Sequence, residues 1–200
     1  MPEADLYQGK ISLCSRCSPN TARTCQEFTA RLRKGKAPNV PPPTLTSSCN
    51  TLFQTGACVP SMPLVTVPQP VSPGLVRLND PDEDSLVLAT ANSRLTFDVL
   101  TGVWAQSLTP AFFLLVDCLG NTVDMAVVYG EFSPERLAQA VRASGLENLV
   151  RRKRLMVPGL TAALAVDFAG ATGWQIEVGP VCAIELPLSL GDRWIPAERR

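Results

Sequence analysis

The residues best suited to chemistry are the cysteines, which are concentrated towards the N-terminal end of the chain. Five of the seven lie in the first third of the 200 residues: Cys14, Cys17, Cys25, Cys49 and Cys58. In a reducing compartment such a cluster favours a bound metal over disulfides. Because no histidine accompanies these thiols, zinc or an iron-sulfur cluster is the chemistry indicated. A module that holds no metal is the alternative left open.

The absence of histidine excludes several kinds of site. A serine–histidine or cysteine–histidine nucleophile, a histidine-bound zinc or haem and a histidine proton shuttle all require an imidazole. The 18 basic and 18 acidic side chains cancel, so net charge does not favour nucleic acid as a partner. No apolar run approaches the length of a bilayer span and the N-terminus lacks a signal-peptide pattern. We therefore expect a cytoplasmic protein without a membrane partner.

The elements that position any site are clearest between residues 154 and 180. A short apolar strand over 155–157 stops at a Pro-Gly turn, and a second strand is expected over 174–178. Between them, one face of a helix collects the apolar side chains of Leu160, Leu164 and Phe168. This order of strand, helix and strand is typical of an α/β unit.

The same alternation is found upstream. The pattern predicts a strand from 86, a helix that starts at the cap residue Ser93, and a buried strand that ends at 116. The apolar run 123–128 suggests a further strand. A helix then begins at Ser133-Pro134 and ends near Gly145. We expect an α/β fold with an open, Rossmann-like, mostly parallel sheet and flanking helices, whose ligands sit at the carboxyl ends of the strands.

Composition divides the chain into four parts. Residues 1–37 form a Cys-rich module, and 38–85 form a Pro-rich linker in which extended backbone is expected. Residues 86–190 form the α/β domain, and 191–200 form a polar tail that contains Trp194. One good core is therefore expected, with a small satellite module.

Several of these stretches resemble one family, the large subunit of the corrinoid iron-sulfur protein of CO dehydrogenase/acetyl-CoA synthase. Its corrinoid-binding domain is similar in the strand and Pro-Gly turn that end at Gly159, in Gly173-Trp174 and in Val178-Gly179-Pro180. The opening strand and loop from 86 to 96 are similar too. Cys14-x2-Cys17 and the helix that begins at Cys25 resemble the family's 4Fe-4S module. The TIM barrel that separates the two parts in the family has no counterpart among these residues.

The resemblance implies two cofactors, a corrinoid (a cobamide related to vitamin B12) and a 4Fe-4S cluster. Cys14, Cys17, Cys25 and Cys49 would hold the cluster, with Cys58 as a rival for the fourth position. A corrin ring needs a floor of small residues and a rim of hydroxyl and amide groups. At the strand ends and the cap region beneath the cobalt, the expected contacts are Thr90, Ala91, Asn92, Thr96, Gly120, Val123, Met125, Ala126, Gly130, Pro158, Gly159, Gly179 and Pro180.

Met125 stands where the family has threonine, and it is either a core residue or a soft thioether below cobalt. The implied function is an iron-sulfur methyl carrier or corrinoid electron-transfer protein that moves a methyl group through Co(I) and methyl-Co(III). The chain would act as a carrier and not as a stand-alone enzyme, and its partners would be a methyltransferase, a methyl-acceptor enzyme and the corrinoid-protein small subunit. Two alternatives stay open: an interaction or assembly subunit that has lost the corrinoid, and an unrelated α/β enzyme.

Overall fold

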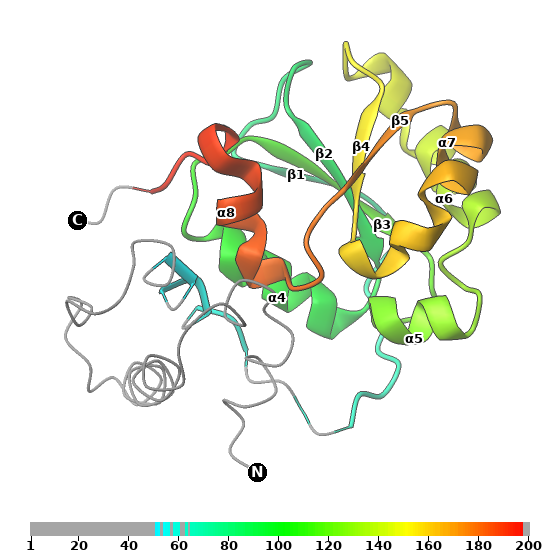
Figure 1. Ribbon diagram of the computed structural model, residues 1–200, viewed down its shortest axis with the longest axis horizontal. Coiled ribbons are helices and arrows are strands. Elements are labelled where there is room, and N and C mark those ends of the chain that lie inside the picture. Colours follow the sequence, from blue (N-terminus) through cyan, green and yellow to red (C-terminus); the bar gives the residue numbers. More distant parts are fainter. Residues whose placement is uncertain (1–50, 53, 57, 61–62, 64, 198–200) are drawn as a thin grey trace.

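The computed structural model describes residues 51–197, except for 53, 57, 61–62 and 64. Five strands form one sheet in the order β1-β3-β2-β4-β5 (Figure 1). Strands β2, β3, β4 and β5 are parallel, and β1 pairs antiparallel with β3 at the edge. The strands are β1 (Gly74–Leu78), β2 (Leu86–Ala91), β3 (Ala111–Val116), β4 (Arg154–Val157) and β5 (Gln175–Val178). The predicted α/β class and mostly parallel sheet are confirmed.

Helices cover both faces of the sheet, which explains why its central strands are continuously apolar. Every residue of β3 is buried, and successive side chains point to opposite faces. Phe112 lies in one core with α5 (Val123–Val128), α6 (Pro134–Ser144) and α7 (Ala165–Thr172). Phe113 lies in the other core with α4 (Arg94–Trp104) and α8 (Leu186–Leu190). The shorter 3-10 turns are η2 (Leu146–Asn148), η3 (Gly159–Leu164), η4 (Ala183–Glu185) and η5 (Gly191–Arg193).

The helices with clear capping residues form where the sequence predicts them. In α6 the Ser133 hydroxyl accepts a hydrogen bond from the Arg136 N–H at 3.4 Å, and Pro134 occupies the first turn. Gly145 ends this helix with φ +68°, a left-handed conformation that glycine adopts without strain. In α4 the buried side chains are Leu100, Val103 and Trp104. These are the ones that its apolar spacing indicates.

The expected strand over 123–128 was wrong, because this run forms α5. The antiparallel β1 occupies one edge of β3, and the parallel β2 occupies the other. No edge of β3 is therefore available to a strand that follows it. The run is apolar because one side of α5 packs on the core through Val123 and Ala126.

The helix predicted after Pro158-Gly159 is split into two parts. It starts as the 3-10 turn η3 and continues as α7. This break rotates the apolar positions, so that Phe168 is buried whereas Leu160 is 44% exposed. The prediction of a single apolar face was therefore wrong for Leu160.

Segments on both sides of the predicted domain pack against it. Strand β1 lies within residues 38–85, where no strand was expected, and Leu52 is buried against the core that contains α4. At the other end, the Trp194 ring meets Trp104 edge-on, with 5.3 Å between centroids. The Leu108 N–H also donates to the Ile195 carbonyl at 2.8 Å. Trp194 is thus bound within this chain and does not project as a free docking residue.

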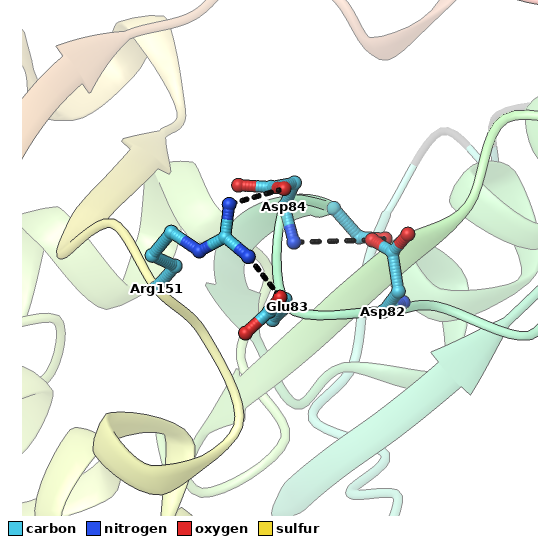
Figure 2. Close-up of polar contacts among 5 residues, drawn as sticks. Asp82, Glu83, Asp84 and Arg151 are labelled. Atoms are coloured by element: carbon cyan, nitrogen blue, oxygen red, sulfur yellow. Dashed lines mark hydrogen bonds and ion pairs between the residues drawn. The ribbon is translucent and has the colours of Figure 1, made fainter.

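The amino edge of the sheet carries a network of ion pairs (Figure 2). Arg151, just before β4, pairs with Glu83 and with Asp84, the latter at 3.3 Å. Lys153 and Arg154 are also paired, Lys153 with Glu147 at 3.1 Å and Arg154 with Glu177 at 4.0 Å. Three of the four basic residues in the run 151–154 thus have an acidic partner. In the part of the chain that the structure describes, no helix combines the length and apolar character needed to cross a membrane.

Candidate functional site

The candidate site is the carboxyl edge of the sheet, where β2, β3, β4 and β5 end together. The chain passes from β2 to its neighbour β3 and then crosses to β4 on the other side of β2. Strand order therefore reverses between β2 and β4, and ligands of open α/β sheets bind in the crevice outside such a reversal. In Figure 1 this edge is bordered by α5, the start of α4, η3 and the loop after β5.

A segment that precedes β1 crosses the ends of β2 and β3. We call residues 68–71 the strap. The Gln69 N–H donates to the Gly120 carbonyl at 3.1 Å, and the Val71 N–H donates to the Asn92 carbonyl at 2.8 Å. The Gln69 carbonyl accepts from the Arg94 N–H at 2.7 Å. Figure 1 shows this part of the chain passing α5 on its way to β1.

Asn92 joins the strap to the loops beneath it. Its side-chain oxygen accepts from the Cys118 N–H at 2.8 Å and from the Gly120 N–H at 3.2 Å. Its side-chain nitrogen donates to the Val71 carbonyl at 3.0 Å. The residue is 1% exposed, so its amide faces the protein and braces the loops. Thr90 and Ala91 are buried beside it, and Thr96 is half-buried in α4.

The ends of β4 and β5 are held together by their backbones. The Gly159 N–H donates to the Pro180 carbonyl at 3.0 Å, and the Gly179 N–H donates to the Val157 carbonyl at 2.8 Å. A Cβ on Gly159 would lie 2.7 Å from the Val181 nitrogen, which is too close for any side chain. The Pro-Gly and Gly-Pro residues predicted to form the site are therefore adjacent, and they are half-buried.

Exposed apolar side chains follow the strands at this edge. Leu119 follows β3, Leu160 follows β4, and Val178 and Val181 lie at the end of β5. Each is between 44% and 55% exposed. We call these four residues the apolar edge. None of the four is among the site residues predicted from the sequence, although Leu119 and Leu160 lie three residues after the buried strands β3 and β4, which was a usable signal.

Helix α5 presents a different surface from the one expected of a cap. Val123 and Ala126 are buried in the core, Met125 is half-buried, and Tyr129 and Gly130 are exposed. Met125 and Gly130 thus remain accessible to a ligand, whereas Val123 and Ala126 support the helix from below.

Cys118 also lies under this edge, and it is fully buried. Burial raises the pKa of its thiol to about 12, so it stays protonated at neutral pH and is a poor nucleophile or metal ligand. Cys118 therefore acts as a core residue beneath the edge.

The predicted cluster ligands Cys14, Cys17, Cys25 and Cys49 lie outside the described residues. Within residues 51–197, apart from the gaps noted above, no three cysteine or acidic side chains are grouped as a metal site. The iron-sulfur module therefore stays a prediction.

Comparison with known proteins places residues 59–188 in a match to the family model described as the CO dehydrogenase/acetyl-CoA synthase delta subunit. Subunit gamma of the acetyl-CoA decarbonylase/synthase complex of Methanopyrus kandleri is 37% identical over 120 residues, which are 60% of this chain and 26% of that protein. The same subunit of Methanothermobacter thermautotrophicus is 34% identical over 113 residues, or 56% of this chain and 25% of that protein.

The corrinoid/iron-sulfur protein large subunit of Moorella thermoacetica is 33% identical over 114 residues, which are 57% of this chain and 26% of that protein. The matched region thus spans about a quarter of the length of each of these relatives. The family match over residues 59–188 contains the whole five-stranded sheet.

Proposed function

This chain belongs to the CO dehydrogenase/acetyl-CoA synthase delta subunit family, because the family match over residues 59–188 covers more than half of its length, and we propose that its α/β domain binds a corrinoid at the carboxyl edge. One similar protein is named a corrinoid/iron-sulfur protein. The observation that carries the proposal in this chain is the apolar edge, which lies where sheets of this topology bind ligands.

The residues of this edge fit the chemistry of a corrin, which is a broad and largely apolar plate with amide groups at its rim. Leu160, Val178 and Val181 leave apolar surface open to solvent on the β4 and β5 side, and covering it with an apolar ring is favourable. The backbone of the Gly159–Pro180 contact keeps this side of the edge free of bulk. With no histidine in the chain, the protein supplies no imidazole to the metal.

The bound corrinoid would supply the methyl-transfer chemistry itself, and the protein would supply binding, orientation and exclusion of water. In this proposal the chain is a carrier that serves a methyltransferase and a methyl-acceptor enzyme, with a small subunit as a further partner. Cys14, Cys17, Cys25 and Cys49 would hold a 4Fe-4S cluster that returns the cofactor to its reduced state.

A second candidate is an interaction or assembly subunit without a corrinoid. Two observations favour it. One is that α5 carries the exposed side chains of Asp124 and Tyr129 in the region expected to form the cap, and the other is that Met125 stands where the family has threonine. In this alternative the apolar edge would contact a protein partner instead.

Equilibrium binding of hydroxocobalamin to the full chain tests the proposal and maps the site. Leu160→Glu places a charge on the apolar edge, where burial under a corrin is unfavourable, and we expect affinity to fall about tenfold or more. Leu108→Glu is the matched control, because Leu108 is similarly exposed at 57% but precedes β3 at the opposite edge. Equal affinities for the two variants would remove the site from this edge.

A further inference from the structure

We propose that the strap, residues 68–71, is one wall of the corrinoid site, and that Gly120 and Asn92 are the positioning residues that hold it. This inference rests on the proposed function and deepens it. It assigns the residues that border the site on the β3 side, where the sequence predicts direct contacts from the strand ends. It also gives Gly120 and Asn92 a role that does not require them to touch the cofactor.

The strap is anchored at the carboxyl ends of β2 and β3. Its hydrogen bonds go to the loops after β2 and β3, at Asn92, Arg94 and Gly120. The turn η3 follows β4 on the other side of β2. A ligand bound at the carboxyl ends of β2 and β4 would therefore have the strap on one side and η3 on the other.

The strap packs tightly against Gly120. Gly120 has φ +82°, and a Cβ at this position would collide with the Pro70 backbone nitrogen. Proline has no N–H, so this approach buries no unpaired donor. Pro68 and Pro70 also restrict the backbone of the strap before it binds, which reduces the entropy lost on ordering. Gly120, which has no side chain, and Pro70, which has no N–H, can therefore pack directly against each other.

Asn92 links the strap to the loop after β3. Through one buried amide it binds the strap at Val71 and the β3 loop at Cys118 and Gly120. Asp117 adds a weaker contact, with its carboxylate 3.4 Å from the Asn92 side-chain nitrogen. A shift of the strap therefore has to break contacts to the loop that precedes α5. The Asn92 side chain therefore fixes the position of both the strap and the loop that leads into α5.

The test compares Gly120→Ala with Gly145→Ala in the full chain. Both glycines have positive φ, +82° and +68°, but a Cβ on Gly145 meets nothing within 4 Å. Gly145 also lies after α6, next to η2 and away from the carboxyl edge. Backbone strain is thus similar in the two variants, and only Gly120→Ala displaces the strap. Gln69→Pro is a second variant, which removes the Gln69 N–H bond to Gly120 without altering the core.

Two readouts are needed, hydrogen exchange at the Val71 amide and the dissociation constant for hydroxocobalamin. We expect faster Val71 exchange and about tenfold weaker binding in Gly120→Ala and Gln69→Pro, with both unchanged in Gly145→Ala. Faster exchange with wild-type affinity would show that the strap is not a wall of the site. Unchanged exchange in both variants would show that these contacts do not hold it. Absence of binding by the wild-type chain would instead remove the proposed function, and the inference with it.

Discussion

At the scale of single residues, the pair of Glu177 and Arg193 connects β5 to the C-terminal segment. The Arg193 guanidinium donates to the Glu177 carboxylate, with one contact at 3.0 Å, and this hydrogen bond holds the pKa of Glu177 below its ordinary value. A lowered pKa in the folded state means that the charged form stabilises the fold. That contribution is present above the ordinary carboxyl pKa and is lost as the pH falls through the lowered value.

We therefore predict that Glu177→Gln destabilises the chain at pH 7 by less than about 1 kcal/mol, because the pair is partly exposed to solvent. The difference from wild type should shrink towards zero as the pH is lowered into the acidic range. Urea unfolding at neutral and acidic pH measures it. A difference that does not change with pH would show that Glu177 acts through packing.

Two helical glycines are predicted to respond in opposite directions to the same substitution. A Cβ on Gly102 in α4 would lie 2.5 Å from the Cys58 carbonyl oxygen, whereas one on Gly170 in α7 meets nothing within 4 Å. Gly170→Ala should stabilise the chain by about 0.5–1 kcal/mol through helix propensity. Gly102→Ala should destabilise it by about 1–3 kcal/mol, because the segment at Cys58 has to move. Urea unfolding checks the signs, and stabilisation by both would mean that this segment does not pack on α4.

At the scale of elements, the C-terminal segment behaves as part of the domain. Trp194 packs edge-on against Trp104, which in turn meets Phe113 at 4.8 Å between centroids. We predict that Trp194→Ala costs about 2–3 kcal/mol in unfolding free energy and reduces the near-ultraviolet circular dichroism of the tryptophans. Ile195→Ala is the control, since Ile195 is 48% exposed in the same segment. Equal losses for the two would contradict the proposed packing.

The elements that the sequence predicts well are those whose local signals agree with their burial. The α6 helix has Ser133-Pro134 at its start and Gly145 at its end, and β3 is apolar on both faces because both are covered. The α5 run has the composition of a buried strand, and only the occupied edges of β3 make it a helix. Strand β1 was missed because Arg77 interrupts its apolar pattern and prolines dominate the region around it.

The sequence predicts that the loops at the strand ends lie together, but not the contacts that these loops make. Parallel strands place their carboxyl ends together, so the loops after β2, β3, β4 and β5 were expected to meet, and they do. The sequence does not show that the strap covers two of these loops. The strap is held by backbone hydrogen bonds, which residues of almost any type can make. Because the strap is not visible in the sequence, Asn92 was predicted to lie at the rim of a ligand. In the structure its side-chain amide forms hydrogen bonds with Val71 and Cys118 instead.

At the scale of the whole molecule, the two ends of the sheet have different chemistry. The amino edge is charged: Arg151 pairs with Asp84 (Figure 2), and Lys153 pairs with Glu147. The carboxyl edge exposes Leu119, Leu160, Val178 and Val181. An apolar cofactor or protein surface is therefore expected at the carboxyl edge, whereas Arg151 and Lys153 at the amino edge are paired within the chain.

The predicted cluster gives the whole chain a second testable property. If Cys49 is the fourth ligand, Cys49→Ser should lower the iron content of anaerobically purified protein to a small fraction of wild type, and Cys58→Ser should leave it unchanged. Hydroxocobalamin binding should be the same in both variants, because the corrinoid is proposed to bind the α/β domain. Full iron in Cys49→Ser together with iron loss in Cys58→Ser would reverse the assignment. Zinc in place of iron would identify a different metal.

The measurement that tests the central claim most directly is the amount and form of corrinoid kept by the wild-type chain. The anaerobically purified protein is mixed with hydroxocobalamin, unbound cofactor is removed by gel filtration, and cobalt and the absorption spectrum are recorded. The proposed site predicts about one retained cobalt per chain, from its single carboxyl edge, with a spectrum that shows no histidine ligand. A folded protein that retains no cobalt would contradict the claim and favour the interaction subunit.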